Sequence, residues 1–119
     1  CIRDRYLRMH GKEVYRHAIE KLATTAQNSM KSAGISVEEI DWIVPHQANI
    51  RIIHGTAKKM GITSDRVLTT VQDHGNTSAA SIPLALSVSK ISGHIKKNDL
   101  IVTEAIGGGL AWGSLVIRW

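Results

Sequence analysis

The sequence predicts an α/β fold in which helices cover a mixed sheet. Segments with helical periodicity alternate with short aliphatic runs, and the last two apolar runs are close enough to pair as a hairpin. The 119 residues, 43% of them hydrophobic and 21% charged, have the size and composition of one globular unit. No internal repeat or linker divides them. We therefore expect a single domain over residues 1–119.

The first helix is predicted over residues 12–33, and Gly34 supplies its stop. Apolar side chains recur there every four residues in a stripe made of Val14, Ala18, Ile19, Leu22, Ala23, Ala26 and Met30. Ser36 and Glu39 then have the spacing of a capping box, in which the amide of each is bound by the side chain of the other. A short helical turn should follow, before a strand over residues 41–45.

The second helix is predicted over residues 49–61. It places Ile50, Ile53, Ala57 and Met60 on one side and ends at Gly61. The β-branched run 66–71 then predicts a short strand.

The third helix is predicted over residues 78–93, with Pro83 near its first turns and Gly93 at its C-cap. Two strands, 99–106 and 113–119, are then expected to form a hairpin across the glycine-rich residues 107–112.

Charge and composition limit the partners. The net charge of +5 and the pI of about 9.7 favour an anionic partner, which could be a nucleic acid, a phosphorylated cofactor or an acidic protein. The basic residues are scattered and aromatic residues make up only 4%, so we do not expect nucleic-acid binding. No apolar run approaches the roughly 18 residues of a membrane span, and the single cysteine, Cys1, has no internal disulfide partner. We expect a soluble intracellular protein.

Two polar positions are candidates for chemistry. His46 follows Pro45 at a strand end, although a lone histidine is more often structural or simply exposed. Asn76 follows Gly75 in the stretch "DHGNTSAAS" and offers an amide that donates hydrogen bonds without carrying charge. On these residues alone, a turn followed by a helix N-cap from Asn76, Thr77 or Ser78 is favoured over catalysis.

The stretch "EAIGGGLAWG" is a third candidate. Three consecutive glycines between strands indicate either positive φ angles or a close approach to the backbone, and their amides could hold a phosphate or polarise a carbonyl oxygen. A plain glycine-rich hairpin is the alternative, and the spacing matches no common nucleotide-binding motif. The six histidines show no i, i+4 pair and no cysteine pair lies near them, so we predict no metal site.

Taken together and in order, "VPHQANIR", "HGNTSAAS" and "GGGLAWGS" closely resemble the C-terminal half of the β-ketoacyl-acyl carrier protein synthase III family. These are condensing enzymes of the thiolase-like superfamily. The resemblance covers essentially the whole chain, from "YLRMHGKEV" to "SLVIRW". It implies the C-terminal half of a thiolase-like fold, and location in the bacterial cytoplasm or the plastid stroma.

The resemblance also implies a reaction and roles. In the family, a cysteine accepts an acetyl or short acyl group from coenzyme A, and malonyl-acyl carrier protein then decarboxylates and attacks it. His46 matches the catalytic histidine, Asn76 the catalytic asparagine, and Gly108 the residue whose amide helps to form the oxyanion hole. Acetyl-coenzyme A and malonyl-acyl carrier protein are substrates, and no cofactor is implied.

Docking residues follow from the same resemblance. The segment of Gln47, Ala48, Asn49, Ile50 and Arg51 matches the part of the family that meets the carrier protein and coenzyme A. Arg16 matches a basic docking position, and Lys58 lies on the same basic helix, where a plain solvated face is the alternative. Complete family members form homodimers.

Two departures from the family pattern matter. The nucleophilic cysteine lies in the N-terminal half of complete enzymes, and Cys1 matches no part of its motif, so we assign Cys1 no catalysis. Ile106 stands where the family often has Phe, which leaves the acyl primer open. We expect the isolated chain to be inactive in condensation and to aggregate through exposed strand edges and apolar faces.

Two other functions compete with this one. A stand-alone module that binds coenzyme A or carrier protein without catalysis is the main alternative. A degradative thiolase is disfavoured because that family's C-terminal half carries its own second cysteine, which this sequence lacks.

Overall fold

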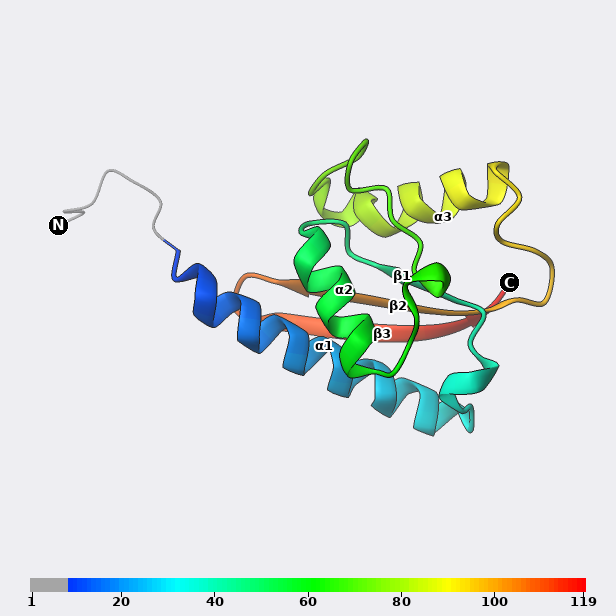
Figure 1. Cartoon of the computed structure of the whole chain (residues 1–119), viewed down its shortest axis with the longest axis horizontal. Coiled ribbons are helices and arrows are strands. Elements are labelled where there is room, and N and C mark those ends of the chain that lie inside the picture. The colour runs from blue at the N-terminus through cyan, green and yellow to red at the C-terminus, as the bar shows by residue number, and fades with distance from the viewer. Residues whose placement is uncertain (1–8) are drawn as a thin grey trace, which may run out of the picture.

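The computed structural model describes residues 9–119, so Cys1 lies outside the described part of the chain. In this part of the chain, three α-helices lie around a sheet of three strands (Figure 1). The helices are α1 (Gly11–Ala33), α2 (Ile50–Lys59) and α3 (Ser81–Ile91). The strands are β1 (Trp42–Pro45), β2 (Leu100–Gly107) and β3 (Ala111–Arg118). Strand β1 pairs parallel to β2, and β2 pairs antiparallel to β3, which confirms the predicted mixed sheet covered by helices.

The helix boundaries follow local chemistry. Helix α1 ends where Gly34 adopts a left-handed φ of +67°, and the Gly34 amide donates to the carbonyls of Met30 and Lys31. Most of the predicted stripe of α1 is buried: Ala18, Leu22, Ala23, Ala26 and Met30. Helix α2 starts after Asn49, whose side-chain oxygen accepts the amide of Arg51 at 2.9 Å. The predicted bounds of α1 and α2 are confirmed to within two residues at each end, whereas α3 begins three residues after its predicted start, behind a 3-10 turn at Ser78–Ala80.

Two further local predictions hold. The Ser36 amide donates to the Glu39 carboxylate at 2.8 Å, and a 3-10 turn at Val37–Glu39 follows, as the capping-box pattern predicts. Pro83 is the third residue of α3, within the first turn, where its missing N–H costs the helix nothing. Beyond that helix, Gly93 has a φ of +79°, so it ends the segment in the predicted place.

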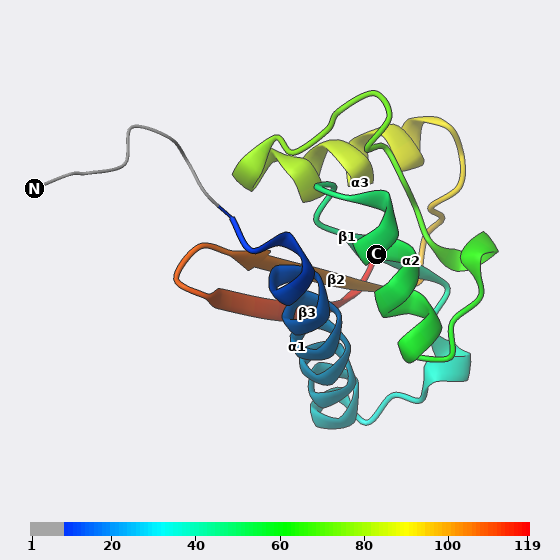
Figure 2. The ribbon, with the colours of Figure 1, turned by 60° about the vertical axis from the view of Figure 1, so that its left-hand side comes forward.

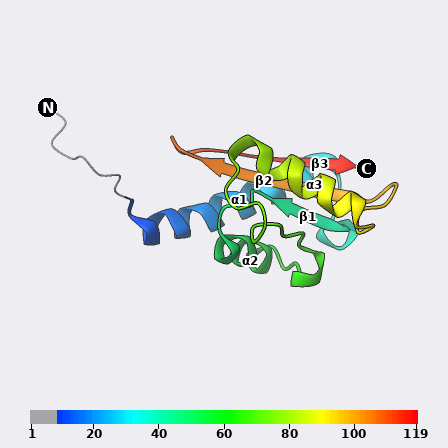
Figure 3. The same ribbon diagram turned by 90° about the horizontal axis from the view of Figure 1, so that it is seen from above.

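The helices lie on two faces of the sheet (Figures 1 and 3). Helices α1 and α2 bury one core against the sheet; its strand residues are Ile43, Leu100 and Val102. Helix α3 buries a second core on the other face, around Val44 and Ile101. Strand residues therefore alternate between two apolar layers, as expected for a sheet buried on both faces. Figure 2 shows the turn of the β2–β3 hairpin extending beyond α3.

The predicted strand over residues 66–71 is wrong. The segment forms a 3-10 turn at Ser64–Arg66 and a single parallel bridge between Val67 and Ile43. The ladder stops because Pro45 has no N–H to donate to it. The Pro45 carbonyl instead accepts the side-chain amide of Gln47 at 2.8 Å. The same side-chain amide also donates to the carbonyl of Leu68 at 3.2 Å. A side chain therefore supplies the hydrogen bond that the next backbone N–H of a strand would make.

Candidate functional site

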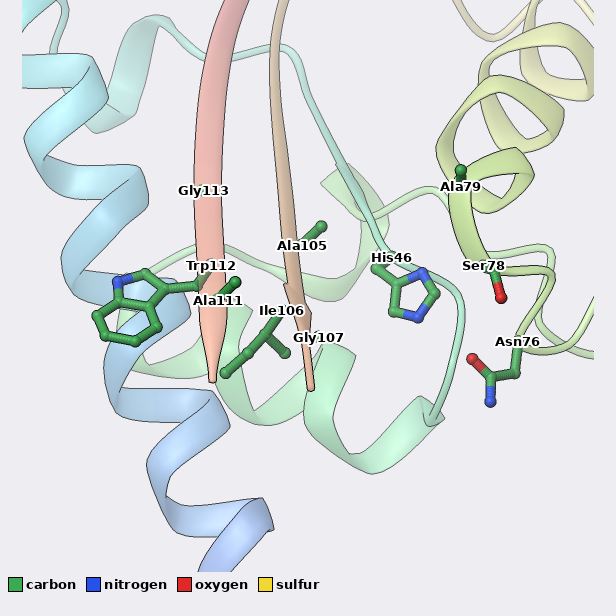
Figure 4. A pocket seen from close by; sticks show the side chains of 10 residues that line it. All are labelled: His46, Asn76, Ser78, Ala79, Ala105, Ile106, Gly107, Ala111, Trp112 and Gly113. Atoms are coloured by element: carbon green, nitrogen blue, oxygen red, sulfur yellow. The ribbon is translucent and has the colours of Figure 1, made fainter. Parts of the chain in front are cut away.

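A hollow of about 590 Å³ opens at the carboxyl end of β1 and beside the β2–β3 hairpin. Its lining residues are His46, Asn76, Ser78, Ala79, Ala105, Ile106, Gly107, Ala111, Trp112 and Gly113. Figure 4 shows the side chains of His46 and Asn76 close together at one side of the hollow and the hairpin at the other. The structure therefore brings together two of the polar candidates from separate parts of the sequence.

His46 is held by the end of the sheet. It directly follows β1, and its amide donates to the carbonyl of Glu104 on β2 at 2.8 Å, which continues the parallel pairing by one residue. Its side chain is half-buried. The imidazole is therefore carried by rigid strand backbone and still reaches the hollow.

Asn76 lies in the loop before α3, in an unusual backbone conformation. Its φ of +49° is in the left-handed region, which asparagine tolerates better than most residues. The Asn76 amide donates to the carbonyl of Gln47 at 2.7 Å. This bond ties the loop to the residue after His46, so the two candidate side chains share one backbone anchor.

The hairpin gives the hollow a flat wall of small residues. Ala105 pairs with Gly113 across the two strands, and Gly107 pairs with Ala111. Cross-strand partners lie on the same face of a sheet, so these four residues form one surface without large side chains. The alternation of small residues in "EAIGGGLAWG" is the signal from which this wall could have been found in the sequence.

Gly108 lies in the exposed hairpin turn and is not among the residues that line the hollow; its neighbour Gly107 is. A Cβ at Gly108 would meet no atom within 4 Å, so steric space does not require glycine there. The role of its amide in an oxyanion hole stays a prediction.

Gln47 differs from what the resemblance implied. Its side chain is 0% exposed, and its amide is bound to backbone groups of residues 45, 68 and 70. A fully enclosed side chain cannot contact a carrier protein or coenzyme A. Its neighbours Ala48, Asn49 and Ile50 are exposed, and the docking role of the segment stays a prediction.

The predicted docking residues fall into two groups. Arg16 and Asn49 line a second hollow of about 610 Å³ between the first turns of α1 and α2, together with Arg51 and Lys12. Lys58 lies toward the other end of α2 and lines a different hollow, with His54 and Thr63. Lys12 and Arg16 of α1 thus meet Arg51 of α2 at one place, and Lys58 is not part of it.

Burial perturbs one acidic group near the site. Glu104 is 2% exposed, and burial raises the pKa of its carboxyl to about 7. Its Oε2 atom has no hydrogen-bond partner. Because Glu104 alternates with Ala105, its side chain lies on the sheet face covered by α1 and α2, opposite the hollow.

Two features of the hollow were not foreseen from the sequence. The ammonium of Lys21 on α1 makes a cation–π contact with the Trp112 ring, 3.8 Å from the ring centroid. Ser78, with a φ of +52°, lines the hollow beside Asn76. Both depend on long-range packing, and no local pattern marks either residue.

Neither a metal cluster nor a membrane span is found in residues 9–119. Within this range no three His, Cys, Asp or Glu side chains gather where they could hold a metal ion. None of the helices there is both long and apolar enough to cross a bilayer.

Comparison with known proteins shows which family the chain resembles in sequence. Residues 30–119 match the family described as 3-oxoacyl-[acyl-carrier-protein (ACP)] synthase III C terminal. The β-ketoacyl-[acyl-carrier-protein] synthase III of Ruegeria sp. is 71% identical over 114 residues, which cover 96% of this chain and 35% of that protein. The corresponding protein of Roseobacter denitrificans is 68% identical with the same coverage.

Solved structures agree with these relatives. The crystal structure of 3-oxoacyl-[acyl-carrier-protein] synthase III from Aquifex aeolicus has a TM-score of 0.92 and is 41% identical, covering 96% of this chain and 37% of that one. The predicted thiolase-like fold is confirmed by this likeness. The chain spans about a third of the length of the curated relatives it matches.

Proposed function

The chain belongs to the 3-oxoacyl-[acyl-carrier-protein] synthase III C-terminal family, and on that premise we propose that it supplies the decarboxylating part of a condensing active site. The observation that carries the proposal is the meeting of His46 and Asn76 in one hollow beside a wall of small residues. The complete enzyme would join a short acyl group from acetyl-coenzyme A to malonyl-acyl carrier protein and so begin fatty acid synthesis.

Decarboxylation is favoured by two neutral hydrogen-bond donors at the thioester oxygen. When malonyl thioester loses carbon dioxide, the electron pair of the breaking C–C bond moves onto the thioester carbonyl and forms an enolate. Negative charge then develops on the thioester oxygen. An N–H of neutral His46 and the side-chain amide of Asn76 can stabilise this charge from two sides. Because neither donor carries charge itself, neither stabilises the malonyl carboxylate in a salt bridge that would oppose its loss.

The condensation step needs a nucleophilic cysteine outside this chain. The enolate carbon attacks an acyl thioester on a cysteine, forms the new C–C bond, and releases the cysteine thiolate. That cysteine would lie in the part of the complete enzyme that precedes this segment. The isolated chain is then expected to be inactive, and the complete enzyme to be a homodimer in the bacterial cytoplasm.

The substrates would enter past the basic ends of two helices. Arg16, Arg51 and Lys12 surround the hollow between the first turns of α1 and α2, and its other lining residues include apolar side chains such as Val14 and Ile52. Positive charge around an apolar groove suits an acidic carrier protein or the phosphates of coenzyme A with a pantetheine arm. Asn49 also lies here, but its side-chain oxygen is engaged in capping α2.

A chimera tests the proposal. In it, this chain replaces the matching 114 residues of the Ruegeria relative, which supplies the rest of the enzyme. We expect the chimera to release carbon dioxide from malonyl-acyl carrier protein and to form acetoacetyl product, at rates within about tenfold of the parent. A chimera that accepts acetyl groups from acetyl-coenzyme A but releases no carbon dioxide would contradict the proposal.

A stand-alone binding module is the second candidate, because the basic hollow is formed by this chain alone. Calorimetry of the isolated chain with acyl carrier protein separates the two. Micromolar binding by the isolated chain, together with an inactive chimera, would favour the module.

A further inference from the structure

Gln47 has a buried side chain in which both the amide nitrogen and the amide oxygen are hydrogen-bonded. Its Nε2 donates to the carbonyls of Pro45 at 2.8 Å and Leu68 at 3.2 Å, and its Oε1 accepts the amide of Thr70 at 2.7 Å. All of these groups are enclosed, and a buried polar group that loses its partner is costly. The side chain thus joins the end of β1 to the segment that precedes the Asn76 loop.

The backbone of Gln47 makes two more connections. Its amide donates to the hydroxyl of Ser81, the first residue of α3, at 2.7 Å. Ser81 is itself 1% exposed. The carbonyl of Gln47 accepts the amide of Asn76 at 2.7 Å. One residue therefore links His46, which precedes it in the chain, to both ends of the segment that carries Asn76.

The loop that carries Asn76 needs such an anchor. Asn76 and Ser78 both have φ angles near +50°, a left-handed conformation that costs energy for serine and less for asparagine. The hydroxyls of Thr70 and Thr77 are buried without a hydrogen-bond partner, so they do not fix the loop. The bond from the Asn76 amide to Gln47 is the contact that ties this strained position to β1.

We propose that Gln47, together with Ser81, is a positioning residue that sets the separation of His46 and Asn76 for decarboxylation. The inference rests on the proposed function. The inference differs from the docking role expected of Gln47. A side chain with 0% exposure can affect the reaction through the protein groups bonded to it and not through direct contact with the carrier protein. Misplacing a catalytic group by about 1 Å costs about 100-fold in rate, so a shifted Asn76 should be visible in kcat.

The test uses the chimera with Gln47→Met, which keeps the length of the side chain but removes its hydrogen bonds, and with Ser81→Ala. Matched controls are Gln72→Met in the same loop and Ser87→Ala on α3, both exposed positions. We expect kcat for release of carbon dioxide to fall 10- to 100-fold in Gln47→Met and Ser81→Ala. The KM for malonyl-acyl carrier protein and the rate of self-acylation should stay within twofold, and the controls should match the parent.

A conservative variant adds a pH profile. In Gln47→Glu, a protonated carboxyl can donate to one carbonyl and accept from Thr70, whereas a carboxylate cannot donate at all. Activity relative to the parent should therefore be nearly restored at acidic pH and fall as the pH rises. A Gln47 that only fills space predicts no such profile. This variant also gives a result if Gln47→Met does not fold.

Two outcomes would overturn the inference. One is unchanged kcat in both Gln47→Met and Ser81→Ala; the other is a raised KM with normal kcat, which would make Gln47 a partner contact after all. Hydrogen exchange of the segment 72–78 separates this inference from the proposed function. If the parent chimera proves inactive, faster exchange of that segment in the two variants, but not in the controls, still supports the anchor, and unchanged exchange refutes it.

Discussion

The amide of His46 donates to the carbonyl of Glu104 at 2.8 Å, so the candidate catalytic histidine is fixed by a residue whose own carboxyl is buried on the opposite face of the sheet. Burial raises the pKa of that carboxyl to about 7, from an ordinary value of 4.5. The same residue therefore holds the site through its backbone and makes stability depend on pH through its side chain.

The first prediction concerns that dependence. Between pH 4.5 and 7 the folded chain keeps Glu104 protonated while the unfolded chain releases the proton, so stability falls as the pH rises through this window. The loss is on the order of 3 kcal/mol when complete. Urea unfolding of the chain at pH 4.5 to 8 should show this decline. Glu104→Gln should flatten it, and Glu13→Gln, an exposed control on α1, should keep it. An equal decline in all three proteins would rule out Glu104 as its source.

The second prediction concerns Gly55, where α2 crosses α1. A Cβ at Gly55 would lie 2.5 Å from Ile19 Cδ1 and 3.3 Å from the Tyr15 hydroxyl. Alanine gains about 1 kcal/mol in helix propensity, but overpacking costs about 1 to 3 kcal/mol. The net effect of Gly55→Ala should be a loss of roughly 1 kcal/mol in the free energy of unfolding.

A second-site change tests the cause of that loss. Ile19→Ala in the Gly55→Ala background should recover stability relative to the sum of the two single changes, because it removes the close Cδ1 and Cγ1 atoms of Ile19. Gly11→Ala is the control, since its Cβ would have only Met9 Cε at 4.0 Å. Strict additivity in denaturant unfolding would show that the helices do not meet at this point.

The third prediction separates the two half-reactions. His46→Ala and Asn76→Ala in the chimera should each lower decarboxylation by about 10²- to 10³-fold, the usual cost of one donor to a developing oxyanion. Self-acylation should fall far less, because it uses the cysteine that the relative contributes to the chimera. His17→Ala and Asn28→Ala, both exposed on α1, are matched controls. Equal loss of both steps would contradict the roles given to His46 and Asn76.

The fourth prediction concerns docking. Arg16→Ala and Arg51→Ala should each raise the KM for malonyl-acyl carrier protein by about 3- to 10-fold with little change in kcat, since charges at a rim act mainly on encounter. The effect should shrink as salt is raised from about 0.05 to 0.5 M. Lys97→Ala, an exposed control near β2, should have no effect. Lys58→Ala should also be weaker than either arginine variant, because Lys58 lines a different hollow.

Much of the fold could be predicted because its signals are local. The stripe of α1, the left-handed Gly34 and the Ser36–Glu39 pair each depend on residues within a few positions of one another. The hairpin is also local, since its two strands are joined by a short turn. The same holds for His46 and Asn76, which the ordered motifs marked before the structure brought them to one hollow.

The sequence by itself determined the three helices, the three strands of the sheet and the mixed α/β class, because periodicity, capping and turn chemistry act over short distances. Its ordered motifs also marked the polar candidates. Only the tertiary structure decided what Gln47 does. Residues 66–71 read as a strand, and Gln47 as a surface contact, until packing placed that side chain among the backbone groups of residues 45, 68 and 70. A buried amide needs partners from wherever the fold provides them, and such long-range pairing leaves no local pattern.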